Sequence, residues 1–464
     1  MRVITRLAVL AALSASARAE APTHAHHVRV LVLNFDPIVP SSGGQRLHEF
    51  FGWNDPHTLA QQYISELSSA TGGLVQQTIV RWMELDEIPL KADGYQYTID
   101  EYVANWQSGG GWHMPDTMKY GQELASHGAR TLIDDDLIDE VWLFGAPYFG
   151  FWEAAMMGPG AFFINGGVYG SFPSSRPFAV MGFNYERGVA EMMHSLGHRV
   201  ENSIARVFGG WQIPNPQTDW DLFAANAGQS SGLPGVGNIH YPANGQSDYD
   251  YGNSTPVLSS ALDWSNYPNL TGATTMVSSA DWATSANSHL GYMRFWYELL
   301  PHAAGRHPAH GRSNDWYAYV YDWLQYDGDG QPLYGPPEAF CASTANSTGM
   351  AATMGWSGSP GLAANDLVLE AGGMPPMAAG VFFHGSSEVQ LPFGPGLRCV
   401  AGQTVRLPLV HADAGGHVSY GFDLSTAVPA IDAGSTRSFQ LWYRDAATSI
   451  GFNTSDGLRV VFCP

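Results

Sequence analysis

The sequence is poor in cysteine. Only three, Cys341, Cys399 and Cys463, occur in 464 residues, and none stands in a Cys-x-x-Cys arrangement. Zinc sites built from cysteines and thioredoxin-like redox sites both depend on such spacing, so neither is expected. In an oxidising compartment three cysteines predict one disulfide and one remaining thiol, without indicating which two residues pair.

Positive charge is also scarce. The chain has 21 Lys and Arg against 42 Asp and Glu, a net charge of −21. Nucleic acids and anionic membrane surfaces bind basic patches, so we expect neither as a partner. After the first residues no apolar run is long enough to cross a bilayer, and we expect no membrane insertion. At 45% hydrophobic and 14% charged residues, the composition is that of a folded protein rather than a disordered one.

The N-terminal residues have the features of an export signal. Residues 1–6 are basic, residues 7–15 are mostly apolar, and Ala17-Arg18-Ala19 fits an Ala-x-Ala cleavage site. This order predicts a secretory signal peptide over residues 1–19. We therefore expect a secreted protein, located outside the cell, on its surface or in the periplasm.

Strand and helix signals alternate along residues 20–325. Short runs rich in Val, Leu and aromatic residues predict strands at 28–35, 74–83, 139–144 and 177–182. Asp55-Pro56 and the capping box that begins at Thr98 predict helix starts between them. The pattern predicts an α/β or α+β domain. Residues 145–172, rich in Gly, Pro and aromatics, are expected to be irregular, either as a binding loop or as a packed loop.

A second domain is expected at the C-terminus. Residues 313–324 are aromatic and predicted to be helical, and the turn-rich stretch that follows predicts a linker over residues 326–337. From residue 338 to 464 the helix signals vanish, and short apolar segments alternate with Gly, Pro and Asp turns. This is typical of an all-β sandwich.

The strongest functional signal is the stretch from Glu191 to Glu201. Glu191, His194, His198 and Glu201 are spaced three, four and three residues apart, which places them on one stripe of a helix. Two histidines at i and i+4 can bind one metal ion, as in zinc peptidases with a His-Glu-x-x-His motif. The position of that motif's catalytic glutamate is Ser195 here, so the helix predicts a metal site but leaves the chemistry open.

A catalytic metal site needs a third protein ligand. We predict His240, in a polar and aromatic loop about forty residues beyond the helix, with Glu201 as the rival ligand. Whichever of the two does not bind the metal can hold a histidine Nδ1–H. Glu191 is the predicted general base because it projects to a similar side of the helix as Ser195. Tyr249 or Tyr251 is predicted to stabilise a developing oxyanion.

Other interpretations of these residues remain open. The stripe can be a ladder of ion pairs and hydrogen bonds on a partly exposed helix face. Glu191-x-x-His194 also has the spacing of di-iron carboxylate bundles, but no second copy of that motif is present. Residues 228–232 match Gly-x-Ser-x-Gly without the strand and helix that a nucleophile elbow requires.

Residues 28–325 resemble a family of exported bacterial proteins of uncharacterised function. The resemblance is carried by residues 34–37, 51–55, 141–144, 147–151, 182–187 and 240–251. The helix around His194 is similar to the active helix of zincin metallopeptidases. That similarity implies a zincin-like fold, a Zn²⁺ ion on His194 and His198, and a polypeptide or other extracellular substrate, while Ser195 departs from the zincin pattern.

The C-terminal part resembles a cysteine-bearing β module at the ends of exported proteins of planctomycetes and myxobacteria. The similar pieces are residues 391–394, 398–399, 439–445 and 455–464. This resemblance implies an accessory role, such as binding a cell-surface partner. Two functions are therefore expected: an exported zinc-dependent hydrolase of metallopeptidase type, or a non-enzymatic binding or surface protein on a degenerate zincin scaffold.

Overall fold

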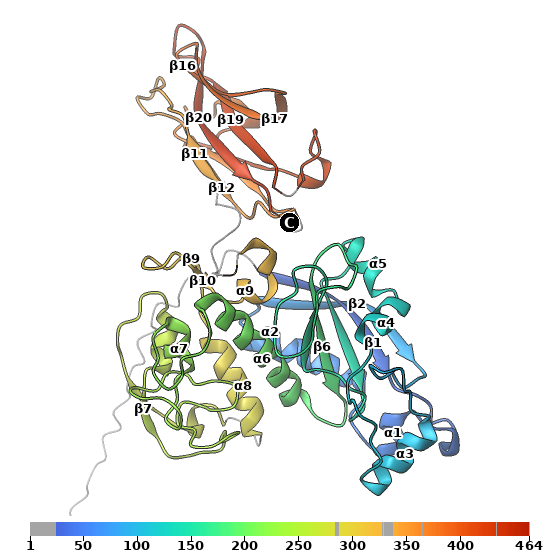
Figure 1. The fold of residues 1–464 in the computed structure, drawn as a ribbon. Coiled ribbons are helices and arrows are strands. Elements are labelled where there is room, and N and C mark those ends of the chain that lie inside the picture. The colour runs from blue at the N-terminus through green and yellow to red at the C-terminus, as the bar shows by residue number, and fades with distance from the viewer. Residues whose placement is uncertain are drawn as a thin grey trace, which may run out of the picture. The chain divides into compact units, whose positions relative to one another are not determined.

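The computed structural model describes residues 25–283, 287–326, 328, 337–362, 365–432 and 434–463. The predicted signal peptide and residues 327 and 329–336 of the predicted linker lie outside the described residues. The chain divides after Tyr321 into two compact units (Figure 1). Among the described residues, no helix combines the length and the hydropathy that a membrane span requires.

A six-stranded sheet forms the centre of the N-terminal unit. Its strand order is β2-β1-β3-β6-β4-β5, with β1 at His26–Phe35, β2 at Val75–Leu85, β3 at Glu140–Gly145, β4 at Ala154–Met157, β5 at Val168–Tyr169 and β6 at Phe178–Asn184. The first four strands in that order run parallel, β4 runs antiparallel to β6, and β5 runs parallel to β4. All six residues of β3 are buried, as expected of a parallel strand with both faces covered.

Two helices of this unit begin where the sequence predicts. Helix α2 (Pro56–Ala70) starts after Asp55, whose side chain accepts the Thr58 N–H, and α3 (Ile99–Ser108) starts after Thr98, which accepts the Glu101 N–H. The other helices are α1 (Leu47–Phe51), α4 (Tyr120–Ser126), α5 (Ala129–Asp134), α6 (Val189–Phe208), α7 (Asp219–Ala224), α8 (Ser288–Leu299) and α9 (Ala318–Tyr321). Strands and helices alternate, so the predicted mixed α/β character is confirmed.

Two local predictions are wrong in part. The segment 145–172 contains β4 and β5, although β4 reads Ala-Ala-Met-Met, without β-branched residues or alternation. All four residues of β4 are buried beside β6, so tertiary packing stabilises a strand that propensity does not favour. Residues 313–315 form strand β10, paired with β9 (His302–Arg306), so the predicted helix over 313–324 is reduced to α9 and one 3-10 turn.

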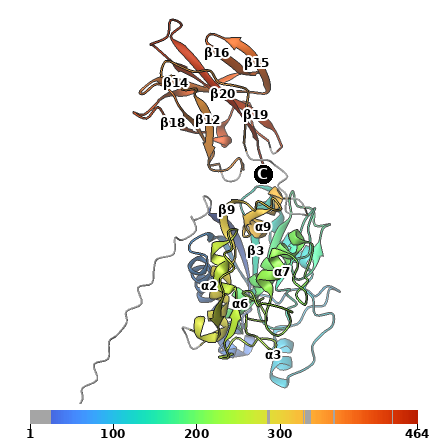
Figure 2. The same cartoon turned by 90° about the vertical axis from the view of Figure 1, so that its left-hand side faces the viewer.

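Helix α6 carries the histidine motif through the core of the unit. It follows β6 directly, contacts β4 and β6, and packs against α2, α8 and α9 (Figures 1 and 2). Its N-cap is Gly188, since β6 extends to Asn184. The Glu191 carboxylate accepts the Gly188 N–H at 3.1 Å and so satisfies the helix start in place of a polar N-cap side chain.

The C-terminal unit is built from antiparallel sheets (Figure 2). One has the order β11-β20-β19-β14-β17 and another β12-β13-β18, while β15 and β16 form a hairpin. Buried residues of the first two sheets form one hydrophobic cluster, among them Leu369, Phe382, Phe439 and Leu458. The strands are β11 (Glu338–Phe340), β12 (Thr353–Ser357), β13 (Val368–Gly372), β14 (Ala379–Gly385), β15 (Ser387–Phe393), β16 (Gly396–Ala401), β17 (Val405–His411), β18 (Val418–Gly421), β19 (Thr436–Arg444) and β20 (Phe452–Val461).

The three cysteines all lie in this β-rich unit. Cys341 and Cys399 form a disulfide across 58 residues of sequence, and Cys463 is a buried free thiol. The expected single disulfide is thus present, and the structure identifies the pair.

Candidate metal centre

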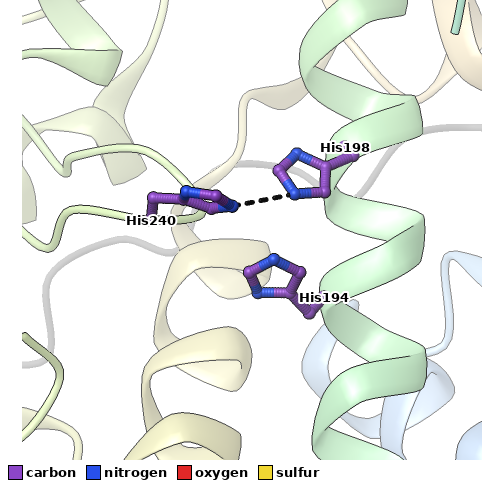
Figure 3. A group of neighbouring side chains, drawn as sticks. All are labelled: His194, His198 and His240. Carbon is purple, nitrogen blue, oxygen red and sulfur yellow. Dashed lines mark hydrogen bonds between the residues drawn. The ribbon is translucent and has the colours of Figure 1, made fainter. Parts of the chain in front are cut away.

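Three histidines from two separate segments converge beside helix α6. His194 and His198 lie one turn apart on the helix, and His240 belongs to the loop between α7 and β7 (Val257–Ser259). One ligand atom from each ring lies within 4.8 Å of the other two. Figure 3 shows the His240 ring reaching toward His198, with one nitrogen of His194 directed at the same place. The predicted trio is therefore brought together.

The close approach of the loop depends on a glycine in the helix. Gly197 lies between the two helical histidines, and a Cβ atom there would be 2.3 Å from Ile239 Cδ1. The absence of a side chain at position 197 lets Ile239, which is fully buried, pack directly on the helix. His240 follows Ile239 in the chain and is thereby held opposite His198.

Hydrogen bonds within the loop fix the position of His240. The Asn238 Oδ1 atom accepts the backbone N–H groups of His240 at 3.1 Å and Tyr241 at 2.9 Å. The His240 carbonyl accepts the Tyr249 N–H at 2.9 Å, and the buried Tyr292 hydroxyl donates to the Asn238 carbonyl at 3.0 Å. These bonds hold the loop on both sides of the histidine, so the ring is placed by the fold rather than by a flexible tether.

Each ring has a partner on its Nδ1 side. Glu201 Oε2 lies 3.0 Å from His198 Nδ1, and Asp248 Oδ1 lies 2.7 Å from His240 Nδ1. Both are carboxylates, which only accept, so each Nδ1 carries the proton. Such partners orient metal-binding histidines and leave Nε2 free for the metal.

The Nδ1 side of His194 is held in a similar way. The Tyr251 hydroxyl lies 3.3 Å from His194 Nδ1 and donates its own proton to the Ile239 carbonyl at 2.6 Å. Its oxygen is therefore an acceptor toward His194. His289 Nε2 is a second neighbour of the same Nδ1, at 3.2 Å. The Nδ1–H form is favoured for this ring too, with Nε2 directed at the other histidines.

This arrangement fits a metal ion. His198 Nε2 and His240 Nε2 lie 3.1 Å apart. If both Nδ1 atoms carry protons, two lone pairs face each other at that distance, and a cation must lie between them. A tetrahedral ion with Zn–N bonds of about 2.0–2.1 Å holds its nitrogens about 3.3 Å apart. The observed separation is close to that value.

The lowered pKa of His194 agrees with a neutral ring that can bind a metal ion. Burial, followed by the neighbouring His198, His289 and His240, lowers the pKa of His194 to about 2, so this ring stays neutral. For His198, burial opposes the charge, but Glu201 outweighs it and raises the pKa. In the metal-free chain a proton on His198 can therefore supply the cation that the two Nε2 atoms need.

The remaining predicted residues are placed around this centre. The carboxylate of Glu201, 4% exposed, accepts from His198 Nδ1 and also from the Ile239 N–H at 2.7 Å. It therefore occupies the orienting position rather than a place among the Nε2 atoms. Glu191 lies behind His194, with Oε1 3.7 Å from His289 Nδ1. The Tyr249 hydroxyl is 3.4 Å from His240 Nε2.

The structure adds Glu153, which the sequence does not single out. Its Oε2 lies 3.8 Å from His198 Nε2, on the metal-facing side, and accepts a hydrogen bond from Asn165 Nδ2 at 2.6 Å. Glu153 precedes β4, and its carbonyl accepts the Gly182 N–H near the end of β6. Because β4 runs antiparallel to β6 and α6 follows β6, this pairing brings the start of β4 to the histidine helix.

A cavity of 360 Å³ opens beside the centre. Its wall includes His194, Ser195, Tyr249 and Glu153, together with Tyr148 and other residues of the aromatic segment that follows β3. The volume falls at the small end of the range of about 300–1,000 Å³ for small-molecule sites. A larger cavity of 670 Å³ lies in the C-terminal unit, but no cluster of metal-binding side chains among the described residues lines it.

Two other groups of possible ligands have the wrong hydrogen bonding for a metal. In the group of Asp219, His307 and His310, a backbone N–H faces Nδ1 of each ring at 3.3 Å. The proton therefore sits on Nε2, which points to Asp219. In the group of Glu87, Glu123 and His127, the bond to Glu123 raises the pKa of His127, which suits an imidazolium between two carboxylates.

No protein-family model matches the chain, and no curated protein sequence matches it.

Proposed function

We propose that the protein is an exported zinc-dependent hydrolase of metallopeptidase type. Zn²⁺ would be held by His194, His198 and His240. One observation carries the proposal: three histidines converge with their Nε2 atoms turned inward, and one of them, His194, lines a cavity whose wall also holds a carboxylate, Glu153. Three nitrogen ligands with an open fourth position are the pattern of catalytic rather than structural zinc.

Zinc in such a site supplies Lewis-acid polarisation of a carbonyl and activation of water. The protein's own residues supply the proton transfers. Glu153 Oε2 is held by Asn165, whereas Oε1 has no hydrogen bond among the described residues. We assign to Oε1 the removal of a proton from the attacking water. Glu153 thereby takes the role of the glutamate that is replaced by Ser195 in the helix motif.

Tyr249 is suited to donate a hydrogen bond to the oxyanion that develops during hydrolysis. Burial, followed by Asp248 and Glu153, raises the pKa of Tyr249, so its hydroxyl stays protonated at neutral pH. Its side chain lines the cavity and lies beside His240. A neutral donor at this place stabilises negative charge on the substrate.

Glu191 has a different part in this proposal from the base role that the helix pattern predicts. Its interaction with His289, opposed by burial, lowers its pKa, which makes it a weak base. One carboxylate oxygen caps the helix at Gly188, and the other faces His289, which in turn faces His194. We assign Glu191 as a positioning residue that acts through His289.

Metal analysis and hydrolysis of a quenched-fluorescent peptide library test the two parts separately. His194→Ala should lower bound zinc from about one ion per chain to near zero, whereas unchanged metal content would rule out the centre. Glu153→Gln should keep zinc but lower kcat by about 10²–10⁴-fold, the usual contribution of a general base. Glu191→Gln should lower kcat much less. Full activity in Glu153→Gln would remove this residue from the base role.

The second candidate is a non-enzymatic binding or surface protein. Ser195 favours it, since the helix lacks the glutamate of zincin peptidases. In that case zinc would stabilise the fold, and His194→Ala would lower the melting temperature while no variant or substrate revealed hydrolysis. A cell-surface partner for the C-terminal unit remains a prediction.

A further inference from the structure

The cavity beside the three histidines contains one strongly basic group in an acidic protein. Of the described residues that line it, Arg187 is the only Lys or Arg, while Asp116, Glu153 and Glu191 are acidic. Each carboxylate already has a partner in the fold. Asp116 pairs with the buried Lys91, Glu153 accepts from Asn165, and Glu191 caps helix α6.

The guanidinium of Arg187 lacks a close partner of this kind. Its nearest carboxylate is that of the adjacent Glu186, with Nε to Oε2 at 3.9 Å, and the Arg187 side chain is 62% exposed. An exposed pair at this distance contributes little, because solvent screens it. The planar fork of N–H donors therefore remains available to a ligand.

The backbone of Arg187 is nevertheless fixed close to the centre. Its N–H donates to the Asn184 carbonyl at 3.0 Å, and its carbonyl accepts from Asn54 Nδ2 at 3.0 Å. It lies one residue before the N-cap of α6, the helix that carries His194 and His198. Its side chain lines the same cavity as His194 and Tyr249.

We propose that Arg187 binds a carboxylate of the substrate, so that the site selects acyl compounds or peptide ends with a free carboxylate near the bond to be cleaved. Guanidinium and carboxylate match in a bidentate geometry that an ammonium group cannot reproduce. A cavity of 360 Å³ suits a small acyl compound or the end of a peptide. This inference rests on the proposed hydrolase function.

The test uses three probes that share an acetylated amino group. N-acetyl-leucine has a terminal carboxylate, N-acetyl-leucinamide has none, and the α-amide of N-acetyl-glutamic acid has only a side-chain carboxylate. Their dissociation constants are measured by calorimetry on the full chain, with and without zinc, for the wild type, Arg187→Gln and Arg187→Lys. Arg130→Gln, on an exposed arginine of α5, is the matched control.

We expect at least one carboxylate probe to bind more tightly than the amide, and the better of the two identifies the source of the carboxylate. Arg187→Gln should weaken that probe by about 10- to 100-fold and leave the amide unchanged, as for a lost charged hydrogen bond. Arg187→Lys should recover only part of the affinity, and Arg130→Gln should match the wild type. Melting temperatures of the variants verify that they are folded.

Several results would overturn the proposal. These are equal binding of acid and amide by the wild type, an unchanged acid preference in Arg187→Gln, or an equal loss for all three probes. If the protein hydrolyses, an Arg187→Gln variant that lowers kcat equally for acid and amide substrates would instead make Arg187 a transition-state group. Carboxylate binding that depends on Arg187 in a chain without hydrolysis would uphold this inference and refute the proposed function.

Discussion

Replacing Glu201 by glutamine changes a group whose two oxygens tie the histidine helix to the His240 loop. The two oxygens of Glu201 accept from His198 Nδ1 at 3.0 Å and from the Ile239 N–H at 2.7 Å. Glutamine keeps the size but offers one acceptor oxygen and one donor NH₂ group. In Glu201→Gln, therefore, one of the two N–H groups must face another donor.

The two orientations of the amide have different consequences. If its nitrogen faces Ile239, a buried backbone N–H loses its acceptor, at about 1–3 kcal/mol. If it faces His198, the ring can move its proton to Nε2 and accept at Nδ1, but that proton blocks the metal-facing nitrogen. Metal binding then requires the first orientation. We expect metal affinity to fall by about 10–100-fold, equivalent to about 1.4–2.7 kcal/mol.

Competition with a chromophoric chelator measures this affinity at fixed pH. Asp248→Asn is a milder change of the same kind. Asp248 orients His240 at 2.7 Å, but its side chain is 51% exposed. Solvent can replace part of its hydrogen bonding, so its effect should be smaller than that of Glu201→Gln. Glu298→Gln, an exposed change on α8, should have no effect. An affinity in Glu201→Gln within twofold of wild type would refute the reasoning.

Three further predictions concern packing, pH and the disulfide. Gly197→Ala should destabilise the chain and weaken metal binding, because the new methyl group meets Ile239, and overpacking of about 1–3 kcal/mol exceeds the helix gain of about 1 kcal/mol; chelator competition and denaturant unfolding check both effects. Burial and then Arg437 lower the pKa of His384 to about 4, so stability that is complete above pH 6.5 should fall by at most about 3 kcal/mol as the pH drops toward 4. Hydrogen exchange of β14 should report this loss in the wild type but not in His384→Phe. Removing the Cys341–Cys399 disulfide, whose cysteines are 58 residues apart, should lower the unfolding free energy of the C-terminal unit by about 4 kcal/mol, measured by denaturant titration.

The elements that could be predicted are those with a local signal. Asp55 before Pro56 predicts the start of α2, and apolar runs predict the first parallel strands within a few residues. Strand β4 has no such signal, because its Ala-Ala-Met-Met sequence becomes a strand only by pairing with β6. Residues 313–315 likewise have no local strand signal, because they become a strand only by pairing with β9.

The same distinction separates the site residues that were predicted from those that were missed. His194 and His198 form a spacing pattern, and His240 stands out in an unusual loop, so the sequence identifies all three. Glu153 follows an aromatic run and has no spacing relation to the helix, so only the antiparallel pairing of β4 reveals it. His289 is a lone histidine near the start of α8 that faces His194 only after the helices pack.

Ser195 is the position at which the histidine helix differs from the helix motif of zincin peptidases. In the helix motif, the base and the metal ligands share one helix, so a substitution at this position would be expected to abolish catalysis. In this fold Ser195 lines the cavity, and the carboxylate of Glu153, just before β4, reaches the same cavity, 3.8 Å from His198 Nε2. A base needs the correct position and proton affinity rather than a particular place in the sequence. The proposed metal site is supported by the Nδ1 partners of His194, His198 and His240, whereas the proposed hydrolysis would depend on Glu153, so the two proposals can fail independently.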